Sequence, residues 1–142
     1  MTWDEFYIGM AEYVSRKSKD TSTKTGAVIV RPDNTVCSVG YNGFAMKMPD
    51  ISEWLQNREE KYSRIIHCEM NALLTAREPV KEHTLYTYPF VSCDRCAVHM
   101  IQTGITRFVF PKLPESLIER WGKSMAKSIQ YFDECGIEWR EL

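Results

Sequence analysis

The sequence predicts an α/β protein in which helices cover a five-stranded mixed sheet. Three observations favour this class. Amphipathic helical patterns alternate with short runs rich in β-branched residues, and two of these runs form a hairpin near the beginning of the chain. The 142 residues suit one globular domain, and no repeat or linker divides them. We therefore expect a single domain over 1–142 with the element order α-β-β-α-β-α-β-α-β.

The beginning of the chain predicts a helix followed by a β-hairpin. Apolar residues spaced three and four apart indicate one buried helix face over residues 3–14. The segments GAVIVRP (26–32) and TVCSVGY (35–41) have the composition of strands. Asp33 and Asn34 form a suitable turn between them.

Beyond the hairpin, helical and extended patterns alternate. An Asn-Gly pair and a proline predict a loop over 42–50, and 51–62 is polar enough for a short surface helix. Prolines and glycines then separate the remaining elements. These are a helix over 67–78, a strand over 84–88, a helix over 93–103, a strand over 105–110, a helix over 117–132 and a short strand over 137–140.

The composition argues against several classes of protein. A net charge of −1 disfavours a large basic surface for nucleic acid. No apolar run approaches the roughly 20 residues that span a bilayer, and the acidic, amphipathic N-terminus is unlike a signal peptide. Five cysteines, an odd number, argue against a disulfide framework. We therefore expect a cytoplasmic protein that does not bind membranes, and nucleic acid is a disfavoured partner.

Two cysteines and a histidine have the spacing of a metal site. Cys93 and Cys96 are three residues apart at the start of an expected helix, so they share a face, and the backbone N–H groups there stabilise thiolates. His67 likewise begins a helix. If the two helices lie side by side on the sheet, one nitrogen and two thiolates can bind zinc and leave its fourth position open for water. Catalytic zinc sites have this pattern.

Glu69 follows His67 by two residues and has a separate role in this interpretation. Zinc lowers the pKa of a bound water to about 7. A carboxylate beside that water can take its proton and pass it to a leaving group, which is the chemistry of hydrolytic deamination. A carboxylate bound to the metal could not move protons freely. We therefore predict that Glu69 is the general acid/base and not a ligand.

Three other interpretations of these residues stay open. The histidine and the cysteines could be ordinary core residues. A C-x-x-C pair at a helix start after a strand also occurs in thiol–disulfide oxidoreductases, although His67 and Glu69 would then have no role. A non-catalytic module with a structural zinc would need a fourth protein ligand. The candidates for that ligand are His83, Asp94 and His99.

The segments HCE and CDRC form the H-x-E and C-x-x-C signature of zinc deaminases. Their surroundings resemble the deoxycytidylate (dCMP) deaminase family from about Ser22 to Phe110. STKTGAVIV resembles the first strand of that family, GYNGF its loop after the second strand, and HCEMNALL its H-[AC]-E-x-N-A-[IL] helix. TLYTYPFVSCDRCAVHMIQTGITRFVF resembles its strand–loop–helix–strand segment with the paired cysteines.

The resemblance implies both a fold and an activity. The fold would be the three-layer α-β-α cytidine deaminase-like fold. The activity would be zinc-dependent deamination of a cytosine deoxynucleotide, dCMP to dUMP and ammonia, with one zinc ion per chain. The family's motifs imply His67, Cys93 and Cys96 as zinc ligands, Glu69 as general acid/base and Asn42 as a sugar contact.

Other residues are candidates for contacts with such a nucleotide. Asn71 could be a polar group of the pocket, and Tyr88 or Phe90 could stack on the base. A 5′-phosphate needs cations or N–H groups. The cationic candidates are Lys24, Arg58, Lys61 and Arg64.

Ser92 departs from the family pattern, which usually has proline directly before the first cysteine. Here Pro89 lies three residues earlier, and Cys93 comes one residue later than usual when counted from the strand. In this family the loop lines the base pocket. The base preference therefore stays open, and dCTP or a 5-substituted dCMP is an alternative substrate.

Two further consequences concern partners. Family members are commonly oligomers, which implies a homo-oligomer here, a hexamer or a dimer. A base deaminase of tRNA or single-stranded DNA would use the same chemistry and is the alternative enzyme. Such enzymes hold the phosphates of a polymer, and the net charge of −1 disfavours this alternative.

Overall fold

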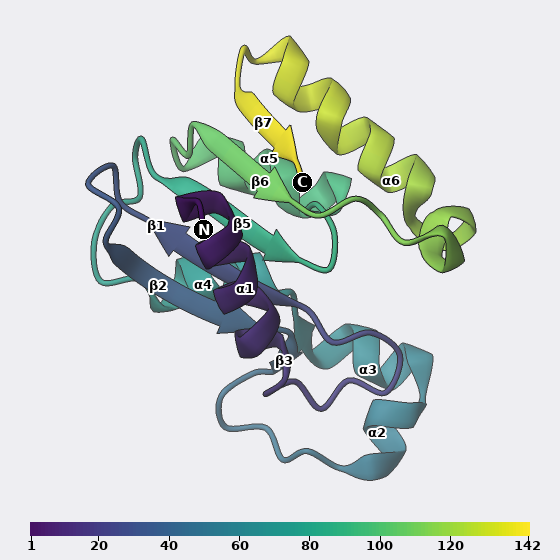
Figure 1. The fold of residues 1–142 in the computed structure, drawn as a ribbon. Helices are drawn as coiled ribbons and strands as arrows, with labels where there is room; N and C mark the ends of the chain where they lie inside the picture. The colour runs from purple at the N-terminus through teal and green to yellow at the C-terminus, as the bar shows by residue number, and fades with distance from the viewer.

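The computed structural model describes residues 1–142 and places a five-stranded sheet between two layers of helices (Figure 1). The strands are β1 (Gly26–Val30), β2 (Val36–Tyr41), β5 (Thr84–Tyr88), β6 (Arg107–Phe110) and β7 (Glu138–Glu141). Their order is β2-β1-β5-β6-β7. Strand β1 is antiparallel to β2 and β5, whereas β5, β6 and β7 are parallel. The expected mixed sheet is confirmed.

Helices cover the two faces of the sheet unequally. One face carries α1 (Trp3–Ser15), and the other carries α4 (Cys68–Thr75), α5 (Asp94–Gln102) and α6 (Glu115–Glu134). Every residue of β1 is buried because its alternate side chains face different layers. Val28 and Val30 pack against α1, whereas Ala27 and Ile29 join the larger core under the other helices. None of these helices is both long and apolar enough to cross a membrane.

Helix α4 lies unusually close to β2. A Cβ atom on Gly40 would be 2.4 Å from the backbone N of Ala72 and 2.5 Å from the carbonyl O of Cys68. No real side chain tolerates such contacts, so only glycine permits this approach. The close packing sets where the N-terminus of α4 lies relative to the sheet.

The segment between β2 and α4 differs from the expected loop and single helix. Strand β3 (Gly43–Phe44) pairs antiparallel with β4 (Ile65–Ile66). Two short helices, α2 (Ser52–Gln56) and α3 (Arg58–Arg64), lie between them (Figure 1). The loop predicted over 42–50 was therefore wrong at β3, because strands of two residues have no periodicity and form only through their partner. When β3, α2, α3 and β4 are set aside, the remaining elements follow the expected order, which is confirmed.

Helix α4 is also shorter than expected, since it ends at Thr75 and not at Glu78. Ala76 already has an extended ψ of 141°. Glu78 lies beyond the helix, where its carboxylate accepts hydrogen bonds of 2.9 and 3.1 Å from Nε of Arg31. Glu78 is therefore part of a long-range ion pair and not of the helix.

Asp4 joins α1 to three elements of the sheet and is 6% exposed. Its carboxylate accepts hydrogen bonds from Tyr86 at 2.7 Å and from Arg107 and Arg140 at 2.8 Å. The bonds from Arg107, supported by those from Tyr86 and Arg140, hold the pKa of Asp4 well below its ordinary value. A depressed carboxyl pKa stabilises the fold above the unfolded pKa of about 3.9, and this contribution declines as the pH falls further.

We expect Asp4→Asn to lower the free energy of unfolding by about 2–4 kcal/mol at pH 7, because two arginines lose their counter-charge. The difference from wild type should shrink as the pH falls below about 4. Urea unfolding of both proteins at pH 7 and below about pH 4 measures the difference in the free energy of unfolding. Glu12→Gln, on the same helix with a 46% exposed side chain, is the control and should change little. A pH-independent difference would contradict the assignment.

Candidate active site

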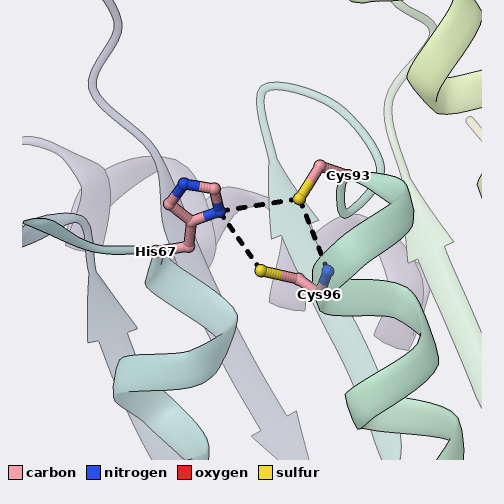
Figure 2. A group of neighbouring side chains, drawn as sticks. All are labelled: His67, Cys93 and Cys96. Carbon is pink, nitrogen blue, oxygen red and sulfur yellow. Dashed lines mark hydrogen bonds between the residues drawn. The ribbon is translucent and has the colours of Figure 1, made fainter. Parts of the chain in front are cut away.

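The N-termini of α4 and α5 meet on the same face of the sheet (Figure 2). His67 is the N-cap residue of α4, Cys93 is the N-cap residue of α5, and Cys96 lies one turn further along. Nδ1 of His67 is 3.2 Å from Sγ of Cys96 and 3.6 Å from Sγ of Cys93. All three atoms lie within 4.8 Å of one another. The structure therefore brings together the three residues that the sequence proposes as ligands.

The two cysteine side chains can both be thiolates only if a cation lies between them. A hydrogen bond from the Cys96 side chain, together with one from His67, lowers the pKa of Cys93 to about 4. The same contact with Cys93 raises the pKa of Cys96. Two adjacent thiolates repel each other unless a positive charge lies between them. A zinc ion, which prefers sulfur and nitrogen ligands, would supply that charge, so the residues present fit zinc.

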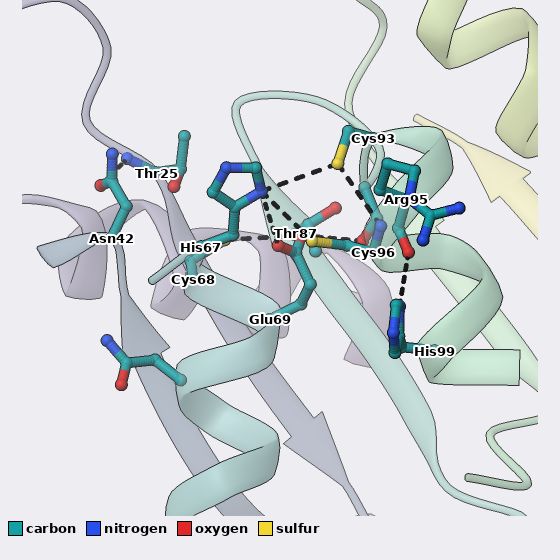
Figure 3. A network of polar contacts seen from close by, with 12 residues as sticks. Thr25, Asn42, His67, Cys68, Glu69, Thr87, Cys93, Arg95, Cys96 and His99 are labelled. Carbon is teal, nitrogen blue, oxygen red and sulfur yellow. Dashed lines mark hydrogen bonds and ion pairs between the residues drawn. The ribbon is translucent and has the colours of Figure 1, made fainter. Parts of the chain in front are cut away.

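No fourth protein ligand joins this group. His99 lies one turn further along α5 than Cys96, and its Nδ1 is 2.7 Å from the carbonyl O of Arg95 (Figure 3). The carboxylate of Asp94 accepts a 2.6 Å hydrogen bond from Ser124. Three protein ligands with one free position are the pattern of catalytic zinc and not of structural zinc.

His83, the remaining fourth-ligand candidate, belongs to a separate group with Cys37 and Glu78. This group lies where β2 and β5 begin, at the opposite end of the strands from His67. Arg31 donates to both carboxylate oxygens of Glu78. The negative charge that a metal would need is therefore already neutralised.

Glu69 lies beside the three ligand atoms and is buried (Figure 3). Its Oε1 is 3.9 Å from Nδ1 of His67, and its Oε2 accepts a 2.8 Å hydrogen bond from the hydroxyl of Ser92. Burial raises the pKa of Glu69. A raised carboxyl pKa favours a group that gives and takes protons near neutral pH.

A cleft that is partly open to solvent leads to these residues. Four predicted substrate contacts line it: Asn42, Lys61, Tyr88 and Phe90. The amide of Asn42 is already engaged, since Oδ1 accepts from the N–H of Thr25 and Nδ2 donates to the carbonyl of Thr23. Asn42 thus holds the loop before β1 against the end of β2.

Four other predicted contacts, Lys24, Arg58, Arg64 and Asn71, do not line the cleft. Asn71 donates a 2.7 Å hydrogen bond to the carbonyl of Tyr41. Arg64 pairs with Glu60, and its guanidinium lies 4.0 Å from the ring centroid of Trp54. For both side chains, a nearer partner explains the orientation.

Lys61 does line the cleft, but its charge is neutralised. Nζ lies 3.2 Å from Oδ1 of Asp20, and both side chains are almost fully buried. The sequence offered no indication of this pair because the two residues are 41 positions apart.

Sequence reasoning missed the contribution of α6 to the cleft, where Arg120 and Trp121 form part of the wall. The ring of Trp121 stacks on Phe90 with centroids 5.9 Å apart. Arg120 donates a 3.0 Å hydrogen bond to the hydroxyl of Tyr62. The apolar stripe of α6 predicts a helix, but nothing local indicates that its first half borders the site.

Comparison with known protein families assigns this arrangement to a class. Residues 1–112 match the cytidine and deoxycytidylate deaminase zinc-binding region. The chain belongs to the cytidine and deoxycytidylate deaminase family. The matched segment includes α4 and α5, and therefore His67, Glu69, Cys93 and Cys96. The family predicted from the sequence motifs is confirmed.

Individual deaminases resemble the chain over most of its length. An uncharacterized deaminase from the luxG 3′ region of Aliivibrio fischeri is 36% identical over 136 residues, which cover 96% of this chain and 90% of that protein. The deoxycytidylate deaminase of Mus musculus is 32% identical over 116 residues, which cover 78% of this chain. The aligned part is 65% of the mouse enzyme, so the chain spans slightly less than two-thirds of that relative.

A solved deaminase structure shows the same fold. The dCMP deaminase of cyanophage S-TIM5, in complex with dCMP and dUMP, superposes with a TM-score of 0.76 at 19% identity. The match covers 97% of this chain and 95% of the phage protein. The cytidine deaminase-like fold expected from the sequence is therefore confirmed.

Proposed function

We propose that this family member is a zinc-dependent deaminase that converts dCMP and water to dUMP and ammonia. The observation that carries the proposal is the buried carboxyl of Glu69 beside three metal-binding side chains that leave one position free. Deoxycytidylate deaminases among the relatives and the dCMP and dUMP bound to the phage enzyme support the choice of substrate.

His67, Cys93 and Cys96 would hold the zinc, which when bound makes a water molecule nucleophilic at neutral pH. Glu69 takes a proton from the attacking water while a C–O bond forms at C4 of cytosine. It gives this proton to N3 of the ring, takes a second proton from the added hydroxyl group as the C4=O bond forms, and delivers it to the amine, so that the C–N bond breaks and ammonia leaves. Burial of Glu69 keeps bulk water from competing for these protons.

The cleft suggests how the base and the sugar would be held. Tyr88 ends β5 and Phe90 lies in the loop after it; both line the cleft, and Trp121 stacks on Phe90. We propose this aromatic wall as the surface for the cytosine ring. Asn42 stays the candidate for a sugar contact, since its Oδ1 can accept a further hydrogen bond, although its Nδ2 already donates to Thr23 and Asp20.

A product assay tests the proposed reaction. Zinc-loaded protein would be incubated separately with dCMP, dCTP, deoxycytidine and 5-methyl-dCMP, and mass spectrometry would detect replacement of the amine by oxygen. Turnover of dCMP is the expected result. Turnover of dCTP or 5-methyl-dCMP alone would support the alternative substrates. A folded, zinc-loaded protein that is inert to all four would contradict the proposal and favour the nucleic-acid or structural-zinc alternatives.

Arg120 is the best placed cation for the 5′-phosphate, because it lines the cleft and has no acidic partner. We expect Arg120→Ala to raise KM for dCMP by about 10- to 100-fold, the cost of a lost charge-assisted hydrogen bond. Deoxycytidine has no phosphate, so its kcat/KM should not change. Lys123→Ala, an exposed cation on the same helix outside the cleft, is the control. Equal effects on both substrates would rule out a phosphate contact.

Two predictions from the resemblance still need their own measurements. Assembly into a dimer or hexamer would be tested by sedimentation of the purified protein. Folding of 1–142 as one domain predicts a single cooperative unfolding transition, which calorimetry would detect.

A further inference from the structure

We propose that Ser92 is a positioning residue that holds the carboxyl group of Glu69 in its catalytic orientation. The inference rests on the proposed function for the role of Glu69, and on geometry alone for the contact. Ser92 is 2% exposed, and its hydroxyl donates a 2.8 Å hydrogen bond to Oε2 of Glu69. The residues are 23 positions apart, so the contact joins the loop before α5 to the first turn of α4.

This hydrogen bond divides the two oxygens of the carboxyl group between different partners. Oε2 accepts from Ser92, whereas Oε1 lies on the side of His67, 3.9 Å from its Nδ1. The other side chains that contact this carboxyl group are the thiols of Cys68, 3.8 Å from Oε2, and Cys96, and thiols are weak donors. Without the serine hydroxyl, the terminal torsion of Glu69 would be free to turn. Water could not replace the donor easily, because both side chains are buried.

Ser92 is itself fixed by α6. Its carbonyl accepts a 2.6 Å hydrogen bond from the hydroxyl of Ser128, which is fully buried. One turn earlier on the same helix face, Ser124 accepts from the N–H of Asp94 at 3.0 Å. Two serines of α6 therefore hold the loop on either side of Cys93. Helix α6 lies beyond the residues 1–112 that match the family model.

Full-length, zinc-loaded Ser92→Ala and Ser92→Thr would be compared with wild type. We expect Ser92→Ala to lower kcat for dCMP by about 10- to 100-fold, because an ordered carboxyl contributes in the transition state, and to leave KM within about twofold. Ser92→Thr keeps a hydroxyl and should recover most of the lost kcat. Zinc content should stay at one ion per chain in both variants. Ser116→Ala, an exposed serine on α6, is the control.

A crystal structure of zinc-loaded Ser92→Ala provides a readout that is independent of activity. We expect the carboxyl of Glu69 to turn away from its wild-type orientation or to occupy more than one. An unchanged orientation of the Glu69 carboxyl in Ser92→Ala would overturn the proposal. So would an unchanged kcat of this variant, if the wild type is active. A raised KM or lost zinc would indicate a purely structural serine. If wild type deaminates no cytosine nucleotide, the proposed function fails. The orientation of the Glu69 carboxyl in wild type, compared with that in Ser92→Ala, still decides whether Ser92 positions it.

Discussion

Glu69→Gln should bind zinc normally and deaminate dCMP at least about 1,000-fold more slowly than wild type. Glutamine has nearly the same shape and can still accept the hydrogen bond from Ser92, so the site should keep its geometry. It cannot take a proton from water or return one to the amine. The loss should appear in kcat, because proton transfer belongs to the transition state and not to substrate binding.

Two measurements on the same preparation decide this prediction. Metal analysis gives the zinc content per chain, and the mass-spectrometric assay gives the rate of dUMP formation. Glu59→Gln, an exposed carboxyl of α3 that is not part of the cleft lining, is the matched control and should behave as wild type. Full activity in Glu69→Gln would exclude the acid/base role and support a zinc that is only structural.

Cys96→Ala should lose both zinc and activity. Cys96 is buried, and its sulfur, one of the three proposed ligand atoms, is 3.2 Å from Nδ1 of His67. Removing it leaves one nitrogen and one thiolate, so we expect zinc affinity to fall by more than about 100-fold. Zinc that binds the folded state also raises thermal stability, and the variant should lose this rise when zinc is added.

Competition with a metal chelator measures the affinity, and melting curves with and without zinc measure the stabilisation. Cys135→Ala, an exposed cysteine near the end of α6, is the matched control. Cys68→Ala is a second comparison, because Cys68 lies next to His67 in sequence but outside the ligand group. If Cys96→Ala retained zinc as tightly as the Cys135 variant, the proposed coordination would be wrong.

The sequence by itself determined the candidate reactive residues and the elements that carry them. His67 and Glu69 share the first turn of one helix, and Cys93 and Cys96 share the first turn of another. Each pair depends on a spacing of two or three residues, which a local pattern records directly. The strands were also predictable from short apolar runs, since β1 is buried on both faces and needs such a run.

Only the tertiary structure decided which other side chains surround those residues. Arg120 of α6 reaches the cleft, whereas Arg64 turns to Glu60 and Trp54 although it lies much nearer to His67 in sequence. Ser92 reaches Glu69 across 23 positions of the chain. Such contacts depend on how α4, α5 and α6 pack on one sheet face. A sequence of exposed charges and hydroxyls does not specify which of them will find a buried partner, because the choice depends on long-range packing and the free energy of desolvation.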